Sequence, residues 1–189
     1  MKPGCVIMAS GLSSRFGAEK LLYPFRGRPL ITWAVECALS AGARTVVVTR
    51  SCHVARIACE AGAQAFVHNR PDRCDTIRYG LTQMDGLPGC AFLVADQPLL
   101  KADTLSGMLK QFCRAPERIL RASHDGRPGN PVIFPSALFD ALSGLKSGQT
   151  GRAVLKGNSA LVDFYEVADP LELADIDTPE AMKALETYR

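Results

Sequence analysis

Short apolar runs alternate with amphipathic stretches along the first 112 residues. Residues 6–8, 46–48, 65–67 and 91–94 are apolar runs of three or four residues, typical of short buried strands. Between the first two runs, apolar residues recur at the spacing of one helix face: Leu30, Trp33, Ala34, Cys37 and Ala38. Pro29 near the start of that stretch and Gly42 just past its end are the expected boundary residues of a helix.

Further helices are predicted after the later runs. The pattern favours helices over residues 54–60, 75–84 and 104–112, the last with apolar residues on one face. A strand followed by a helix, repeated along the chain, is the signature of a parallel sheet with helices on both sides. We therefore predict a three-layer α/β/α architecture with a mostly parallel sheet.

The pattern is less regular after Ser123. Residues 124–131 are predicted to be a loop from their glycine and proline content, and residues 132–134 a short strand before a helical segment that begins at Pro135. Residues 161–167 form a late strand, and Thr178 followed by Pro179 starts a last helix. The sequence holds no repeat, linker or low-complexity tract, so we predict a single domain over residues 1–189.

Composition narrows the class of protein. The 189 residues carry 22 Lys plus Arg and 19 Asp plus Glu, a net charge of +3 that does not favour a nucleic-acid partner. With 47% hydrophobic and 22% charged residues, the chain is typical of a globular protein. No apolar run approaches the ~20 residues of a membrane span, and the start Met-Lys-Pro is unlike a secretory signal. We expect no membrane partner and a cytoplasmic location.

The cysteines and histidines do not suggest a metal site. Seven cysteines without a Cys-x-x-Cys pair argue against a zinc site or a disulfide framework. We expect burial among apolar neighbours for Cys5, Cys37, Cys90 and Cys113. Cys74 is predicted to lie in an exposed polar loop. The three scattered histidines are expected to be structural or surface residues.

Candidate chemistry begins directly after the first predicted strand. Glycines and small hydroxyl residues between Ala9 and Lys20 can expose consecutive backbone N–H groups to an anion. Arg15 and Lys20 add two positive charges suited to a polyphosphate. The glycine spacing matches neither a P-loop nor the dinucleotide fingerprint. Phosphate binding is therefore the functional interpretation, and an ordinary surface turn is the alternative.

Carboxylates follow two other strand ends. Asp96 comes two residues after the 91–94 run, at the sheet edge that also holds the first loop. Asp175 and Asp177 are two residues apart and share a face if that segment is extended. Mg²⁺ takes one or two protein carboxylates together with phosphate oxygens. These residues could complete a magnesium site, or they could simply serve as turn and helix-capping residues.

In chain order, these segments resemble one known family. The chain carries Gly-x-Ser-x-Arg-x-Gly-x-x-Lys from Gly11, then Asp96-Gln97-Pro98, Pro128 to Pro131 as Pro-Gly-Asn-Pro, Thr150-Gly151-Arg152, and Asp-Ile-Asp-Thr-Pro from Asp175. This series is similar to the molybdenum cofactor nucleotidyltransferases, within the wider nucleotide-diphospho transferase group that has a Rossmann-like α/β/α fold. The later motifs narrow the resemblance toward members that use CTP.

The resemblance implies roles for individual residues. A nucleotide-binding role is implied for Ala9, Ser10, Gly11, Ser13, Arg15, Gly17, Lys20, Thr76, Arg78 and Asp96. Arg15, Lys20 and Asp96 would be catalytic, and Asp96 with Asp175 or Asp177 would hold Mg²⁺. The molybdopterin substrate would contact Pro128, Gly129, Asn130, Gly151 and Arg152. Further partners implied are a molybdoenzyme or its chaperone.

The sequence departs from the family pattern at three positions. Ser10 stands where relatives carry Ala or Gly beside the base, which leaves GTP as the alternative to CTP. Asn130 replaces a frequent His, and Thr76 replaces a Ser. A sugar phosphate as acceptor is a second alternative, and a non-catalytic module that delivers the cofactor is a third.

Overall fold

The computed structural model describes residues 1–11, 16 and 19–188, and residues 12–15, 17–18 and 189 lie outside the description. Within that part, a seven-stranded sheet has the order β5-β4-β1-β6-β8-β7-β9. Its strands in chain order are β1 Gly4–Ala9, β4 Thr45–Thr49, β5 Gln64–Val67, β6 Gly89–Val94, β7 Ile119–His124, β8 Arg127–Pro135 and β9 Val162–Glu166. Two further short strands, β2 Pro24–Phe25 and β3 Arg28–Pro29, pair as a separate hairpin.

The sheet is parallel except at one strand. β1 pairs in parallel with β4 and β6, β4 with β5, and β7 with β9. Among the strands that the structure describes, β8 alone runs against its neighbours β6 and β7. The predicted mostly parallel sheet is therefore confirmed.

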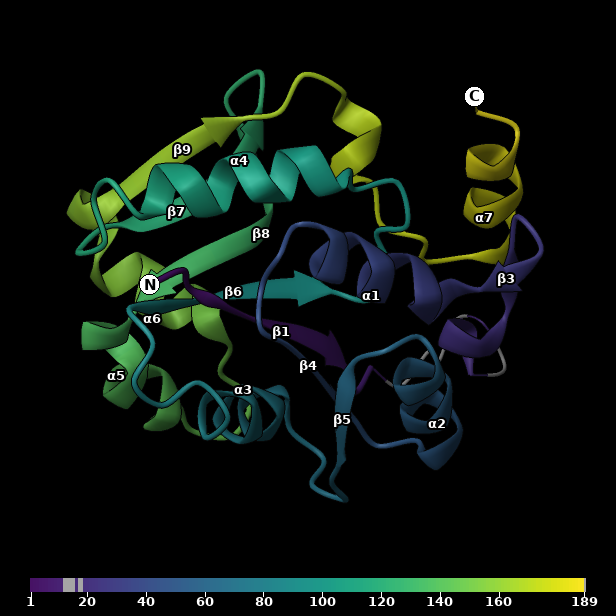
Figure 1. The fold of residues 1–189 in the computed structure, drawn as a ribbon, viewed down its shortest axis with the longest axis horizontal. Coiled ribbons are helices and arrows are strands. Elements are labelled where there is room, and N and C mark those ends of the chain that lie inside the picture. Colours follow the sequence, from purple (N-terminus) through teal and green to yellow (C-terminus); the bar gives the residue numbers. More distant parts are fainter. Residues whose placement is uncertain (12–15, 17–18, 189) are drawn as a thin grey trace.

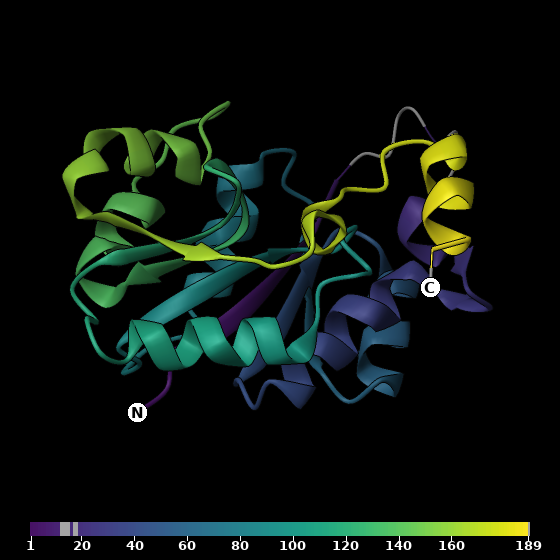
Figure 2. The ribbon, with the colours of Figure 1, turned by 90° about the horizontal axis from the view of Figure 1, so that it is seen from above.

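Helices cover both faces of the sheet. The helices are α1 Leu30–Ser40, α2 Cys52–Glu60, α3 Arg73–Leu81, α4 Ala102–Phe112, α5 Phe139–Ser143, α6 Gly151–Gly157 and α7 Pro179–Glu186. Single 3₁₀ turns are Lys20–Leu22, Ser136–Leu138, Ser159–Leu161 and Pro170–Leu173. Figure 1 shows the order of the strands, and Figure 2 shows the sheet between its two helical layers. No helix in the described ranges is long and apolar enough to cross a bilayer.

Two apolar cores explain the layers. Alternate strand residues point to opposite faces, so Ile7 and Leu93 join one core with α1, α2 and α4. Val6 and Phe92 join the other core with α3, α5 and α6. α3 approaches β1 closely at Gly80, where a Cβ would lie 2.6 Å from Val6 Cγ1. The three-layer α/β/α prediction is confirmed.

The predicted loop over residues 124–131 is wrong. The segment is a hairpin in which β7 and β8 are joined at Asp125 and Gly126, whose φ angles are 47° and 72°. An Asp-Gly pair with positive φ is the favoured two-residue hairpin turn. Gly151 and Arg152 lie in the first turn of α6, where the Thr150 side chain accepts a hydrogen bond from the Arg152 amide.

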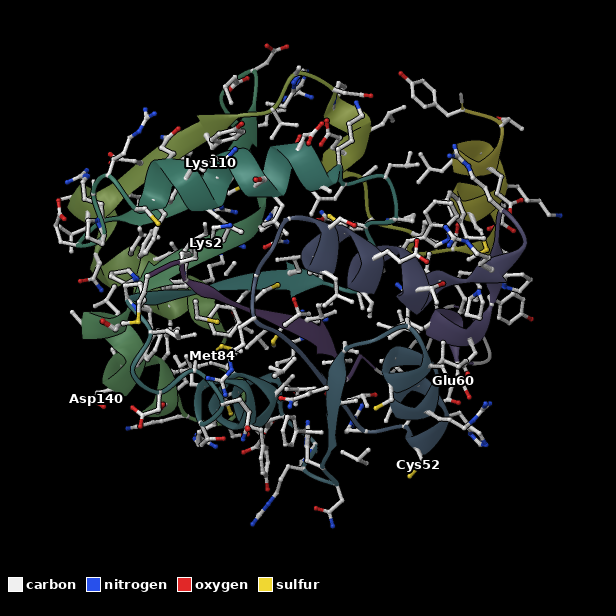
Figure 3. The ribbon with its side chains drawn as sticks, viewed as in Figure 1. Lys2, Cys52, Glu60, Met84, Lys110 and Asp140 are labelled. Carbon is white, nitrogen blue, oxygen red and sulfur yellow. The ribbon has the colours of Figure 1, made fainter. Side chains whose placement is uncertain are left out.

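Two cysteine predictions are also wrong. Cys74 is 2% exposed in the first turn of α3, packed against the second core. Cys113 is exposed just after α4, where its sulfur lies 3.8 Å from the Met1 carbonyl oxygen. Cys52, at the outer end of α2 in Figure 3, is exposed as well.

Candidate active site

Four parallel strands end at the same edge of the sheet, which we call the carboxyl edge. β1, β4, β5 and β6 end there, and the next residues along the chain are polar: Ser10, Arg50, His68 and, two residues past β6, Asp96. Ligands of open α/β sheets bind at this edge. The carboxyl edge therefore gathers the groups that the sequence placed at separate strand ends.

Lys20 and two carboxylates form a charged cluster at this edge. Lys20 Nζ lies 2.7 Å from Asp96 Oδ2 and 3.6 Å from Asp177 Oδ1. The Lys20 side chain is 10% exposed and that of Asp96 23%. Asp177 lies on a segment held by a bond from the Ile176 amide to the Asp96 carbonyl, at 2.9 Å. Residues far apart in sequence thus meet at one point.

Asp175 completes this group of acids. Burial raises the pKa of its carboxyl group, and the charges of Asp96 and Asp177 raise it further. A hydrogen bond with Gln97 and the charge of Lys20 act in the opposite direction. Repulsion that reaches from one carboxylate to the next shows that the three acids share one electrostatic site.

The donor set fits a divalent cation. Three carboxylates offer the hard oxygen ligands that Mg²⁺ prefers, and Lys20 lies within ion-pair distance of two of them. Asp96, Asp175 and Asp177 are therefore the residues that could hold such an ion.

A cavity of about 720 Å³ lies beside the cluster, over the ends of β1, β4 and β5. Its lining includes Ser10, Gly11, Arg50, His68 and Tyr79. Gly11 has open space where a Cβ would be. The volume falls within the range of small-molecule sites, which is about 300–1,000 Å³.

His68 organises the floor of this cavity. Its ring is 6% exposed and stacks on Tyr79 at 5.1 Å, with 17° between the planes. The Arg70 amide donates to Nδ1 at 3.2 Å, which places the proton of the neutral ring on Nε2. Nε2 lies 3.0 Å from Ser10 Oγ and 3.2 Å from Thr76 Oγ1. Burial lowers the pKa of His68; the charge of Asp75 opposes this and that of Arg50 adds to it, so the pKa stays below its usual value and the neutral form is favoured.

The Ser10 hydroxyl group forms its hydrogen bonds within the protein. It donates to the Val48 carbonyl oxygen at 3.2 Å and faces the Nε2 proton of His68. The Ser10 carbonyl accepts from Arg50 Nε at 3.1 Å. Ser10 therefore presents its bulk to a ligand, while its hydroxyl group stabilises the cavity wall.

Thr76 and Arg78, both assigned to the nucleotide by the resemblance, lie in different surroundings. Thr76 is 1% exposed and reaches the cavity only through His68. Arg78 donates to the carbonyl oxygens of Ser143 and Leu145 at 2.7 Å each and to Asp75 at 2.5 Å. These contacts tie α3 to the end of α5, so the structure gives Arg78 a structural role and does not bring its side chain to the cavity.

The residues assigned to the second substrate lie along β8 and α6. Pro128, Gly129 and Asn130 belong to β8, and the Asn130–Pro131 peptide bond is cis. A Cβ on Gly129 would lie 3.0 Å from Leu173 Cδ1, next to the segment that carries Asp175. Ser13, Arg15 and Gly17 fall outside the described residues, and their roles stay predictions.

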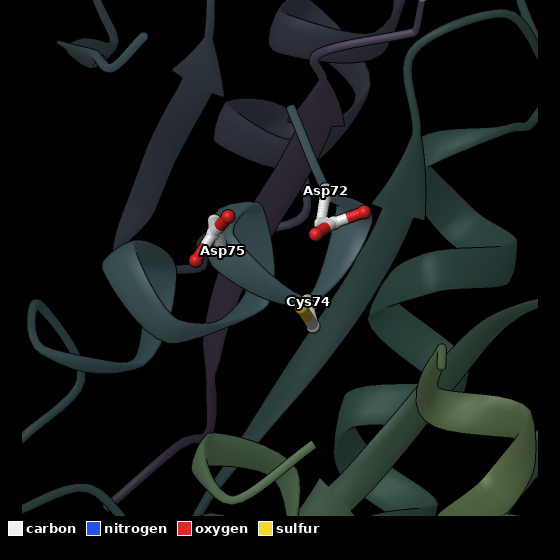
Figure 4. Close-up of side chains that lie close together, drawn as sticks. All are labelled: Asp72, Cys74 and Asp75. Atoms are coloured by element: carbon white, nitrogen blue, oxygen red, sulfur yellow. The ribbon is translucent and has the colours of Figure 1, made fainter. Parts of the chain in front are cut away.

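A second acidic group lies on the first turn of α3. Figure 4 shows Asp72, Cys74 and Asp75 close together. Asp75 is paired with Arg78 at 2.5 Å, and Cys74 is buried in the core. We assign no chemistry to this group.

The sequence reasoning missed His68, Arg50 and Tyr79. The signal for His68 was available, because the residue follows the predicted strand 65–67 just as Asp96 follows 91–94. Treating the histidines as scattered along the chain hid this position. Tyr79 carried no such signal, because it reaches the cavity from a helix.

Comparison with known proteins shows the family of the chain. Residues 5–163 match the family described as the MobA-like NTP transferase domain. The chain belongs to this family. The family is one of nucleotidyltransferases, as the sequence resemblance implied.

Individual relatives carry different names. The chain is 31% identical to purine catabolism protein PucB of Bacillus subtilis, over 93% of this chain and 91% of the relative. It is 28% identical to nicotine blue oxidoreductase of Paenarthrobacter nicotinovorans, over 95% and 94%. It is 25% identical to the molybdenum cofactor cytidylyltransferase of Escherichia coli, over 93% and 91%.

A solved structure shares the fold. Rv0371c of Mycobacterium tuberculosis superposes with a TM-score of 0.85 at 21% identity, covering 99% of this chain and 98% of the other. The same protein has been solved as a complex with manganese.

Proposed function

We propose that this chain transfers CMP from CTP to the terminal phosphate of molybdopterin that carries molybdenum, with release of pyrophosphate. The observation that carries the nucleotidyl transfer is the cluster of Lys20 with Asp96 and Asp177 beside the cavity. The acceptor follows from the motif series and from the relative with cytidylyltransferase activity in its name. CTP, magnesium and molybdopterin are parts of the proposal.

The reaction balances without an added oxidant or base. An oxygen of the acceptor phosphate forms a bond to the α-phosphorus of CTP, and the bond from that phosphorus to the bridging oxygen of the β-phosphate breaks. The attacking group is already an anion, so positioning and charge neutralisation can supply the rate. This agrees with a site whose one buried histidine bonds to wall residues.

The residues divide the work by position. Lys20 offsets negative charge that gathers on the leaving pyrophosphate, and Arg15 is expected to assist it. Asp96, Asp175 and Asp177 would hold Mg²⁺, which supplies charge neutralisation at the phosphates when bound. The cavity between Gly11 and His68 is the place that we assign to the nucleoside.

Ser10 supports CTP over GTP through its volume. The side chain has a Cβ that crowds the larger purine more than a glycine would, while its hydroxyl is bonded to Val48 and His68. A preference of about 10–200-fold is expected from shape in one pocket. Competition of CTP with GTP in one mixture, with the dinucleotide product identified, decides the base.

The direct test is pyrophosphate release from CTP with purified molybdenum cofactor. Wild-type protein should release pyrophosphate only when both substrates and Mg²⁺ are present. Asp96→Asn removes a hard anionic ligand at nearly constant size, so turnover should be lost while the thermal unfolding curve shows a folded protein. Normal Mg²⁺-dependent turnover in that variant would remove Asp96 from the site.

A further inference from the structure

A second positively charged position lies on the opposite side of Asp96 from the cavity. Arg121 is a β7 residue that pairs with Val132 of β8, and its side chain is half-buried. Ile119, two residues earlier on β7, packs into the core beneath α3, α5 and α6. Residues two apart on a strand point to the same face, so Arg121 points to this face as well. Arg121 Nε donates to the Gly129 carbonyl oxygen at 3.0 Å, which fixes the plane of the guanidinium group.

No carboxylate offsets this charge within the residues that the structure describes. Among these residues Arg121 forms no ion pair, and its Nη1 and Nη2 donate to no acceptor. The charge that it meets is a like one. Burial lowers the pKa of Arg121, and the charge of Arg152 lowers it further.

Arg152 lies on α6, near enough for its charge to act on Arg121. It is exposed on the first turn of the helix, and the described residues give it no acidic partner either. Gly151 beside it lies against Phe134 of β8, where a Cβ on the glycine would be 3.6 Å from Cζ of the ring. Two guanidinium groups held near each other without a carboxylate are unfavourable until an anion binds between them.

Arg121 is connected to the acidic cluster through a short series of contacts. Gln97, next to Asp96, donates to the Leu173 carbonyl at 2.9 Å. The Leu173 side chain lies against Gly129, whose carbonyl holds Arg121. β6, which leads to Asp96, lies between β1 on the cavity side and β8 on the arginine side. Asp96 is thus placed between the two regions.

We propose that Arg121 and Arg152 together bind a phosphate monoester group of the acceptor. The inference rests on the proposed nucleotidyl transfer, and it adds Arg121 as a residue that selects the acceptor. A guanidinium group presents paired N–H donors that match phosphate oxygens bidentately. The Gly129 contact leaves the outer pair on Arg121 for the ligand.

Inorganic phosphate is the probe for this site. Its affinity is measured by calorimetry on the full chain with Mg²⁺ and saturating CTP, so that the triphosphate region is already filled. Arg121→Gln and Arg152→Gln should each weaken phosphate binding about ten-fold or more, the effect of losing a charge-assisted hydrogen bond. Arg114→Gln is the matched control, because Arg114 is an exposed arginine beyond the end of α4. The phosphate affinity of the Arg114→Gln variant should stay within about two-fold of that of the wild type.

The outcomes separate binding from architecture. A structural role for Arg121 alone predicts a lower melting temperature in Arg121→Gln with phosphate affinity unchanged, and that result would overturn the proposal. If Arg121→Gln does not fold, Arg152→Gln decides, since its side chain is exposed. Absence of phosphate binding by CTP-loaded wild type would also overturn it. If phosphate binds through both arginines but CTP yields no pyrophosphate with molybdenum cofactor, the proposed function fails and the anion site stands.

Discussion

Replacing Lys20 by Met tests whether the buried lysine neutralises the acidic cluster. Met keeps the length and the apolar stem of the side chain and removes the cation near Asp96 and Asp177. Breaking a well-buried ion pair costs about 3–5 kcal/mol. The Lys20 side chain is 10% exposed, but Asp96 is 23% and Asp177 51% exposed, so solvent screens part of the loss. We expect a loss of about 2–3 kcal/mol in the free energy of unfolding.

That loss can be measured by thermal unfolding. For a chain of this length, each kcal/mol lowers the melting temperature by about 2–4 °C, which gives a fall of about 4–12 °C. Arg56→Met is the control, because Arg56 and its partner Glu60 form an ion pair at 2.7 Å whose side chains are 63% and 59% exposed. The control should lose about 1 kcal/mol or less.

Activity gives the second reading of the same pair of variants. Lys20→Met should lower kcat/KM for CTP by about 10²–10³-fold, the effect of losing one group that stabilises charge in the transition state. Arg56→Met should leave kcat/KM unchanged, since Arg56 is exposed on α2 and pairs with Glu60 outside the acidic cluster. A Lys20→Met protein with the same melting temperature as the Arg56→Met control and normal turnover of CTP would refute both the structural and the catalytic reasoning.

Two other variants test the packing and the cavity floor. Gly80→Ala places a Cβ 2.6 Å from Val6 Cγ1 and should lower the free energy of unfolding, measured by denaturant titration, by about 1–3 kcal/mol. Gly157→Ala is the control, because its Cβ meets open space. Equal stability of the two variants would contradict the close approach of α3 to β1. His68 has a folded-state pKa below its usual 6.5, so its neutral form stabilises the fold fully above pH 6.5, and that stability is lost as the pH falls below it. His68→Gln should flatten this part of the stability–pH curve, and an unchanged slope would show that other groups cause it.

The parallel part of the fold follows directly from local sequence patterns. β1, β4, β5 and β6 are apolar runs with helices between them, so their order of strand and helix could be predicted. The β7–β8 hairpin was hidden because glycine and proline composition indicated a loop. The Asp125-Gly126 pair was the available signal for a turn. Composition alone does not distinguish a hairpin turn from a longer loop.

The site was predicted at the level of strand ends and not of contacts. Placing Asp96 and Lys20 at one edge needed only the parallel sheet, but their 2.7 Å ion pair depends on how the chain turns after β1. The hydrogen bonds from Arg78 to the carbonyl oxygens at the end of α5 could not be predicted either, because they depend on the packing of α3 against a segment more than 60 residues away. Tertiary packing decides such side-chain partners.

The reversal of direction at β8 divides the carboxyl edge into two stretches that evolution can alter separately. The cavity is built on β1, β4 and β5, within the first 79 residues, whereas Arg121 and Arg152 come from β7 and α6. Mutations after residue 118 can therefore reshape the side that we assign to the acceptor and leave the cavity lining intact. A chimaera that takes residues 119–166 from a relative would keep its nucleotide and inherit a new acceptor. The fold is in this respect a reusable nucleotide-activating half joined to an exchangeable one.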